Sequence, residues 1–569
     1  MTEIDLMKKI FPDAAAGSGV DTMYADCLKL TKDMVAVPSQ NATSGERDIG
    51  DFIYQYIKKI PYFKKHPEQV MAVPLKNDPL GRRNILALLI GEKDDCKDTV
   101  ILHGHTDTVG VEDFGSLKDC AFDCDRLAAR LLEIQDQLPM EVREDLLSGD
   151  YLFGRGSSDM KSGDAVHMTV LARLCEQPQR LRGNVLVSFN PVEESLHTGF
   201  IEAVDVLLKL KEKYRLNYLF AINNDYICGM YPGDETRYVY TGSVGKLLPC
   251  FYIRGKETHV GQAFEGVDAC RIGAELVRLM NLNCDMCDGY KGEFPAPPTV
   301  LQMRDLKPYY SVQTPISAFL YFNYMVHNKS VSEIFDGLKA LAQKAANHVL
   351  SEMDERYRRY CEMVGIAAAE QKASIHVMEY RDIYHLAQKH YSGDLDGLIL
   401  QIARISIKDC ADKRETALKI VERLFELSQI KEPTIILFFA TPHCPHNTLK
   451  DEVPEEKALA DDIAALIARF GAENGENYKL MHFFPSLTDS SYLKIDDDDA
   501  SIQALKENFP VQELLYPVPY EKIRDLNIPG LNYGAFGKDA HKWTERVKMS
   551  YSFGKLPKLI IETIKTYLM

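Results

Sequence analysis

An apolar run that ends in two histidines and an aspartate is the feature that most constrains this chain. Residues 100–109 read Val-Ile-Leu-His-Gly-His-Thr-Asp-Thr-Val. Such a run is typical of a buried strand that carries functional groups to the carboxyl edge of a parallel sheet. Side chains two apart share a face, so we expect the Asp107 carboxylate to accept the proton on one imidazole nitrogen of His105, leaving the other nitrogen free for a metal. A hydrogen-bonded structural histidine is the alternative reading of this segment alone.

Further acidic residues follow other apolar segments. Asp159 lies in a glycine-bounded turn before an apolar helix expected over 165–174, Glu193-Glu194 follow a strand at 185–190, and Asp225 follows one at 218–222. The carboxyl ends of parallel strands meet at one edge of a sheet, so these ends predict a compact site of imidazole and carboxylate groups. A solvated acidic pair is the alternative for Glu193-Glu194.

The alternation of helices and strands up to about residue 230 predicts an α/β fold. Apolar strands separated by helical segments are typical of a doubly wound, mainly parallel sheet. At 569 residues, the chain is too long for one hydrophobic core, so two or three domains are expected.

The chain resembles the dizinc metallopeptidase family of aminoacylases, glutamate carboxypeptidases, succinyl-diaminopimelate desuccinylases and bacterial di- and tripeptidases. The matching motifs are residues 104–109, 154–156 with 159–163, Glu193-Glu194, and Ala540-His541, in family order. Within the family, the long chain and the segment 483–492 are most similar to the arginine-utilisation branch.

The resemblance implies a complete set of metal ligands. Asp159 would bridge two divalent ions, His105 and Asp225 would complete one site, and Glu194 and His541 would complete the other. Asp225 departs from the family pattern, because a tyrosine follows it where the family usually has proline. The expected cofactors are two Zn²⁺ ions, and Mn²⁺ or Co²⁺ would also suit these ligands.

The resemblance also implies that Glu193 is the general base. Two ions about 3.5–4 Å apart lower the pKa of a shared water towards roughly 7, and a free carboxylate must then take its proton. Adjacent residues at the end of a strand point in different directions, so Glu194 can bind metal while Glu193 stays free. Thr488-Asp489 stands where the family often has a helix-capping pair near its site.

The character of the sequence changes near residue 238, where the resemblance implies an inserted α+β, ferredoxin-like lid. We therefore expect a catalytic domain in two parts, 1–238 and 448–569, and a lid over 239–447 that is enlarged by helices. His259, between glycines at the family's flanking positions, would reach into an active site and stabilise the oxyanion. A surface loop histidine is the alternative.

The lid also departs from the family. Residues 323–325 are Asn-Tyr-Met where the family commonly has Asp-x-Arg, and the asparagine usual before the lid proline is not evident at 311–315. Because those family positions help to hold the substrate carboxylate, recognition of a free carboxylate stays open. The pattern over 332–429 is mainly helical, and such an enlarged lid could imitate a second subunit, so monomer and homodimer both stay open.

Composition and charge narrow the range of partners. Lys+Arg number 67 against 83 Asp+Glu, a net charge of −16, which argues against a nucleic-acid partner. The amino terminus, residues 1–5, is acidic, and no apolar run approaches the ~18 residues of a membrane span. We therefore expect a cytoplasmic protein with no membrane partner. Thirteen irregularly spaced cysteines, with Cys284-x-x-Cys287 as the one Cys-x-x-Cys motif, indicate reduced thiols.

The motifs of several other enzyme classes are missing. The sequence has no Gly-x-Ser-x-Gly elbow, phosphate loop, His-Glu-x-x-His helix or dinucleotide fingerprint. The expected function is metal-dependent hydrolysis of an amide bond in a small peptide or N-acyl amino acid, with a link to arginine catabolism implied by resemblance alone. The alternative is a non-hydrolytic, metal-containing protein that binds a metabolite or a partner.

Overall fold

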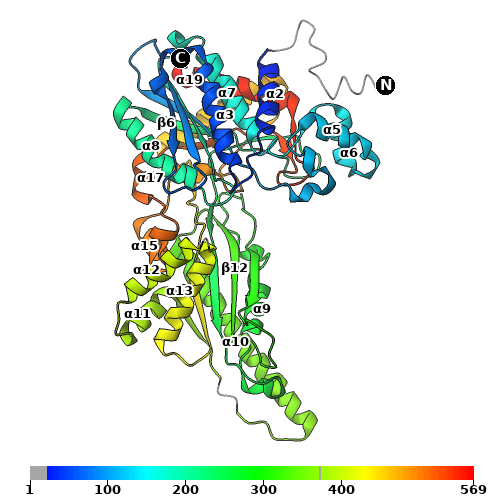
Figure 1. The fold of residues 1–569 in the computed structure, drawn as a ribbon, viewed down its shortest axis with the longest axis vertical. Coiled ribbons are helices and arrows are strands. Elements are labelled where there is room, and N and C mark those ends of the chain that lie inside the picture. Colours follow the sequence, from blue (N-terminus) through cyan, green and yellow to red (C-terminus); the bar gives the residue numbers. More distant parts are fainter. Residues whose placement is uncertain (1–21, 371–372, 410) are drawn as a thin grey trace.

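A computed structural model describes residues 22–370, 373–409 and 411–569. The acidic amino terminus and Cys410 lie outside the described residues. Two sheets lie one beyond the other along the long axis of the molecule, and the carboxyl terminus lies toward the end that holds the first sheet (Figure 1).

The first sheet has eight strands in the order β1-β2-β5-β3-β6-β17-β7-β16. β3 is parallel to both of its neighbours, β5 and β6, and β16 is parallel to β7, whereas β2 is antiparallel to β5. The α/β class is therefore confirmed, with a mixed sheet. The bounds are β1 Val70–Pro74, β2 Arg83–Leu89, β3 Asp98–His105, β5 Asn184–Asn190, β6 Asn217–Asn223, β7 Arg237–Tyr240, β16 Tyr478–Met481 and β17 Gly530–Asn532.

The central strands are buried on both faces because their alternate side chains enter two different cores. Val100 and Leu102 of β3 pack in one core and Ile101 packs in the other. A strand covered on both faces must be apolar throughout, which is why the run reads as continuous rather than alternating. The first core is built with α2 (Thr22–Val35), α3 (Gly45–Lys59), α7 (Lys161–Leu174) and α19 (Leu556–Leu568), and the second with α8 (Thr198–Tyr214) and α17 (Tyr520–Leu526).

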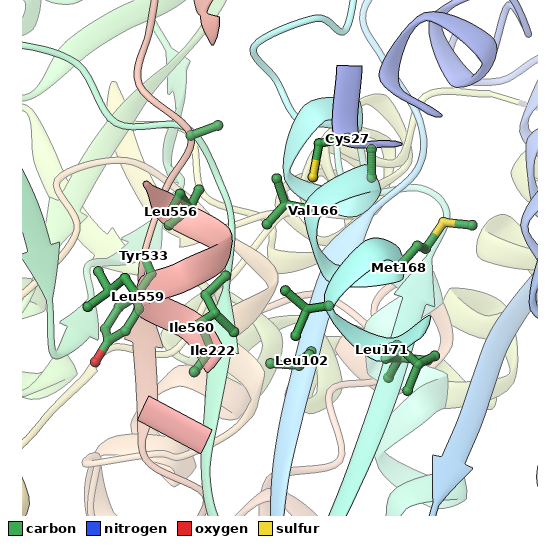
Figure 2. Close-up of a cluster of buried hydrophobic side chains, with 14 of the residues drawn as sticks. Cys27, Leu102, Val166, Met168, Leu171, Ile222, Tyr533, Leu556, Leu559 and Ile560 are labelled. Atoms are coloured by element: carbon green, nitrogen blue, oxygen red, sulfur yellow. The ribbon is translucent and has the colours of Figure 1, made fainter. Parts of the chain in front are cut away.

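Figure 2 shows the first core, where Val166 and Leu171 of α7 and Leu559 and Ile560 of α19 pack near Leu102. The last helix of the chain therefore covers the same face as a helix from its first third.

The second sheet is mostly antiparallel, in the order β11-β12-β10-β14-β13, with β9 paired to the end of β12. Helices cover both of its faces. One face packs on α9 (Ala269–Met280) and α10 (Val331–Val364), and the other packs on α11 (Tyr380–His390), α12 (Leu395–Lys408) and α13 (Lys413–Ser428). The strand bounds are β9 Gly245–Leu247, β10 Pro249–Arg254, β11 Thr299–Asp305, β12 Ser317–Val326, β13 His376–Glu379 and β14 Thr434–Phe439.

The helical segment predicted over 332–429 thus has a structural use. Leu418, Val421 and Leu424 of α13 pack on the face of the second sheet that α9 and α10 leave uncovered. The predicted division at 238/239 and 447/448 stays a proposal, and its first boundary falls within β7.

The remaining described elements connect or flank these layers. They include β4 (Tyr151–Phe153), β8 (Gly242–Ser243), β15 (Asn447–Thr448), β18 (Gly537–Lys538), β19 (Arg546–Lys548), α5 (Cys124–Glu133), α6 (Met140–Ser148), α14 (Pro454–Asn474) and α15 (Asp499–Glu507). Across the described residues we find no helix that combines the length and apolar character required to span a bilayer. The described cysteines are free thiols, Cys284 and Cys287 included.

Candidate metal centre

The predicted ligands meet where the central strands of the first sheet end. His105 is the last residue of β3, Glu194 follows β5, and Asp225 follows β6. Asp159 lies in the turn before α7, and His541 lies in the loop after β18. The parallel order β5-β3-β6 puts three of these segments side by side at one edge.

These residues form two groups that share Asp159. Donor atoms of His105, Asp159 and Asp225 lie within 4.8 Å of one another, and so do those of Asp159, Glu194 and His541. His105 Nε2 is 3.0 Å from Asp159 Oδ1, while His541 Nε2 is 3.1 Å from Asp159 Oδ2. Each oxygen of one carboxylate therefore faces a different group.

The donor chemistry fits two divalent cations. The Nδ1–H of His105 donates to the backbone carbonyl of Asp107 at 3.1 Å, so in the neutral ring Nε2 carries a lone pair. That lone pair and the lone pairs of the Asp159 oxygen repel each other. A cation placed between the two atoms would be bound by both of them. Nitrogen and oxygen donors in sets of three, with room for a water, are typical of catalytic zinc sites.

The charges of the site also favour bound cations. Burial raises the pKa of Asp225 well above its usual range, and the neighbouring Asp159 carboxylate raises it further. Hydrogen bonds to Asp159 and Glu194 raise the pKa of His541 to about 11. Buried carboxylates at this density need positive charge close by, and divalent ions would supply it.

Asp107 has a different contact from the one that the sequence suggested. Its carboxylate lies 3.8 Å from His105 Nδ1. Instead it accepts the backbone N–H of Glu193 and that of Glu194, each at 3.0 Å. The predicted carboxylate–imidazole bond is wrong because β3 ends at His105, so the alternation of an extended strand does not continue to Asp107. Asp107 holds the Glu193-Glu194 backbone, and the Asp107 carbonyl orients the imidazole.

Glu193 is buried beside the two groups and belongs to neither of them. Burial raises the pKa of its carboxyl group well above the usual range. His197 Nδ1 is 3.8 Å from Glu193 Oε1 and 3.3 Å from Asp489 Oδ1. Asp489 begins a short 3₁₀ helix whose N-cap is Thr488, as the resemblance suggested.

A cavity of about 350 Å³ opens over the two groups. Its walls include residues that sequence reasoning missed, namely His197, which follows Glu193 by four positions, and Lys246 of β9. Neither carries a local signal, because a single histidine or lysine outside a motif is common in structural positions. The full lining is His105, Asp159, Glu193, Glu194, Ser195, His197, Asp225, Tyr226, Lys246, Pro442, Phe484, Ser486, Leu487 and His541.

His259 is not among the described residues that line this cavity. It is exposed on the second sheet's side of the molecule, where its Nδ1 accepts the backbone N–H of Gly261 at 3.1 Å and its backbone forms a bridge with Gln313. His259 therefore does not lie at the candidate metal ligands of the same chain. Its role in stabilising the oxyanion stays a prediction.

A buried ion pair supports the turn that carries Asp159. Glu545 accepts the backbone N–H groups of Ser158 and Asp159 at 3.0 and 3.1 Å, and Arg155 Nη1 donates to Glu545 Oε2 at 2.8 Å. Gly156 has φ +78°, and a Cβ there would lie 2.7 Å from the Thr108 side chain, so glycine is needed at this position. The Gly-Arg-Gly motif thus fixes the position of the shared carboxylate.

Replacing Glu545 by glutamine should destabilise the protein by about 1.5–3 kcal/mol, because the buried Arg155 guanidinium loses its charged hydrogen bond to Glu545 and keeps only Asp113 as a charged partner. It should also weaken metal binding about 10–100-fold, as changes behind metal ligands do. Urea unfolding at fixed metal concentration measures the first effect and a metal titration the second. Glu141→Gln is the matched control, since Glu141 pairs with Lys538 at the surface and should change stability by less than about 1 kcal/mol. Equal effects from the two variants would contradict the support role of Glu545.

Comparisons with known proteins agree with this geometry. The sequence model of peptidase family M20/M25/M40 matches residues 101–494. Protein RocB of Bacillus subtilis (strain 168) is 38% identical over 534 residues, which are 94% of this chain and 93% of RocB.

Two solved structures share the fold. A tripeptidase from Staphylococcus aureus subsp. aureus Mu50 superposes with a TM-score of 0.50 at 14% identity, over 95% of this chain and 98% of that chain. The di-peptidase Dug1p of Saccharomyces cerevisiae gives a TM-score of 0.50 at 12% identity, over 99% and 98%. At these identities the two structures establish a common fold and nothing more.

Proposed function

Because the chain belongs to the peptidase family M20/M25/M40, as its motifs predicted, we propose that it is a hydrolase that uses two divalent metal ions to cleave an amide bond of a small peptide or N-acyl amino acid. The observation that carries this proposal is the pair of ligand groups joined by Asp159, with the buried and unligated Glu193 beside them.

Five residues would hold the ions. Asp159 would bridge them, with His105 and Asp225 on one side and Glu194 and His541 on the other. Zn²⁺ suits these nitrogen and oxygen donors, and Mn²⁺ or Co²⁺ would also be accepted. When bound, such ions supply a water of lowered pKa and polarise a carbonyl oxygen.

Glu193 would move the proton. Its carboxylate takes a proton from the attacking water and gives it to the leaving amide nitrogen, which must be protonated before the C–N bond breaks. A carboxyl group whose pKa is raised by burial suits this work, because it is a stronger base than an ordinary carboxylate. Asp107 holds the Glu193 backbone, and His197 lies on its other side.

The cavity favours a small substrate. At about 350 Å³ it is near the lower end of the roughly 300–1,000 Å³ of ligand pockets. Pro442, Phe484 and Leu487 give one part of the wall an apolar character that suits an acyl group or an apolar side chain. A link to arginine catabolism and a cytoplasmic location stay predictions.

Metal removal tests the proposal. The purified protein should contain about two metal ions per chain and should release free amine from members of a panel of dipeptides and N-acyl amino acids, arginine derivatives included. Chelation should abolish release, and added Zn²⁺, Mn²⁺ or Co²⁺ should restore it. Failure to bind any of these ions would overturn the proposal.

The same panel separates the alternative function, a non-hydrolytic protein that binds a metabolite or a partner. Metal binding without cleavage of any panel member would favour that alternative. The presence of Glu193 beside the ligands supports the hydrolase, because a binding protein has no need of an unligated buried carboxylate.

A further inference from the structure

A second cavity, of about 670 Å³, lies apart from the candidate metal centre. One wall consists of α11 and α12, from the helical layer on the second sheet, and the other runs from the end of α15 through α16 (Gln512–Leu515). Figure 1 shows α15 next to α12. None of the five candidate metal ligands is among the described residues that line this cavity. A molecule bound there would therefore not meet the metal ions.

Hydrogen bonds fix one wall of this cavity against the other. The backbone N–H of Arg381 donates to Asn508 Oδ1 at 3.2 Å, and the Arg381 guanidinium donates to Glu507 at 2.8 Å. Lys413 of α13 donates to the backbone carbonyl of Leu515 at 2.6 Å. Because the chain's own bonds hold both walls, the cavity needs no ligand to form, as is usual for small-molecule sites.

Much of the cavity surface is apolar. Phe509 and Tyr380 line it and are buried. Leu400 of α12 and Leu514 of α16 line it from opposite walls, and 36% and 40% of their surfaces are exposed. A ligand with a large apolar group would remove these leucine surfaces from water, which favours its binding.

One buried polar atom of the wall has no partner. Gln512 is 4% exposed, and its Oε1 accepts no hydrogen bond from any described residue. Its Nε2 donates to the hydroxyl of Tyr520, and that hydroxyl donates to His443 Nδ1 at 3.0 Å. Burial lowers the pKa of His443 to about 3, so the ring is neutral and can accept this bond. The amide is thus held in one orientation, and a ligand with an N–H group would supply the donor that Oε1 lacks.

Charged side chains of both signs line the exposed rim without an ion-pair partner among the described residues. Arg404 and Lys506 are cations on opposite walls, and Glu513 is an anion that follows Gln512 in the chain. Lys506 Nζ lies 5.6 Å from the centroid of the Tyr520 ring, whose hydroxyl binds Gln512. A cation and the unpartnered acceptor therefore lie near the same ring, so the wall suits a ligand that carries an anion and an N–H donor close together.

We propose that this cavity binds a free amino acid with a large apolar side chain, at a site separate from the candidate metal centre. The side chain would lie between Leu400 and Leu514, the ammonium would donate to Gln512 Oε1, and the carboxylate would pair with Lys506. A fatty acid lacks the donor and an amine lacks the anion, whereas an amino acid carries both on one carbon. The site would bind its ligand without cleaving it, because the metal ligands lie elsewhere.

Calorimetry with L-phenylalanine and three analogues tests each contact. 3-Phenylpropanoate lacks the ammonium, 2-phenylethylamine lacks the carboxylate, and L-alanine lacks the large side chain. L-Phenylalanine should bind at least tenfold more tightly than each analogue, because each one leaves part of the wall without its partner. Lys506→Gln should abolish the preference over 2-phenylethylamine and keep the preference over L-alanine. Lys408→Gln, at an exposed position of α12, should keep both.

A pair of variants on α12 shows where the amino acid binds. Leu400→Asp should weaken L-phenylalanine more than tenfold, because it puts a carboxylate where the apolar side chain would lie. Ile405→Asp is the matched control, since Ile405 is 52% exposed on the same helix and is not among the described residues that line the cavity. Absence of binding, equal affinity for all four compounds, or unchanged affinity in Leu400→Asp would overturn the proposal. Because binding is measured without turnover, this outcome is independent of the hydrolase proposal.

Discussion

The Glu193→Gln protein is expected to lose turnover by a factor of about 10²–10⁴ while keeping both metal ions. The amide has nearly the same shape as the carboxylate but cannot accept a proton from water. Glu193 lies outside both ligand groups, so the metal content should not change. The backbone bond from Glu193 N–H to Asp107 is also kept, because glutamine supplies the same donor.

Turnover at saturating substrate and metal content by mass spectrometry measure the two halves of this expectation. Glu144→Gln, at an exposed position on α6, is the matched control and should match the unmodified protein in both. A loss of metal in Glu193→Gln would show that Glu193 is a ligand rather than a base. Full turnover would remove it from the mechanism.

The grouping of the five candidate ligands could be predicted in part, because it follows from strand order. A parallel sheet brings the ends of β5, β3 and β6 to one edge, so a histidine or an acid directly after each apolar run had to lie near the others. Asp225, which lacks the proline usual in the family, lies with His105 and Asp159. Asp159 and His541 come from turns, and only the order of the motifs connected them to the strand ends.

The contacts around the ligands could not be predicted from local pattern. The point at which β3 stops being extended decides where the Asp107 carboxylate lies, and a shift of one or two residues sends it to another partner. His197 and Lys246 line one cavity from separate segments, and Asp489, which contacts His197, lies 292 positions from it in the chain. No spacing rule connects positions that are brought together by the junction of two sheets.

The second sheet illustrates the same limit. Periodicity predicted the helices of 332–429, but the sequence did not show that three of them, α11, α12 and α13, cover a sheet face that would otherwise be open to solvent. Whether His259 acts at a site depends on where this sheet lies relative to the ligands, which the motif around His259 does not encode.

The Asp159→Asn protein is expected to lose both metal ions, because one carboxylate serves the two ligand groups at once. The amide offers a single neutral oxygen, so it can replace at most one of the two contacts to His105 and His541. The loss of affinity should exceed the roughly 10–100-fold that is typical of changes behind the ligands, and activity should fall with it.

Asp225→Asn is the matched variant, since Asp225 belongs to one group alone. It should weaken the binding of one metal ion and leave the other ion bound. The number of bound metal ions per chain should therefore fall towards one in Asp225→Asn and towards zero in Asp159→Asn. Metal titration followed by calorimetry separates these outcomes. If Asp159→Asn retained one tightly bound ion, the two groups would be independent sites, and the shared carboxylate on which the dimetal assignment depends would be ruled out.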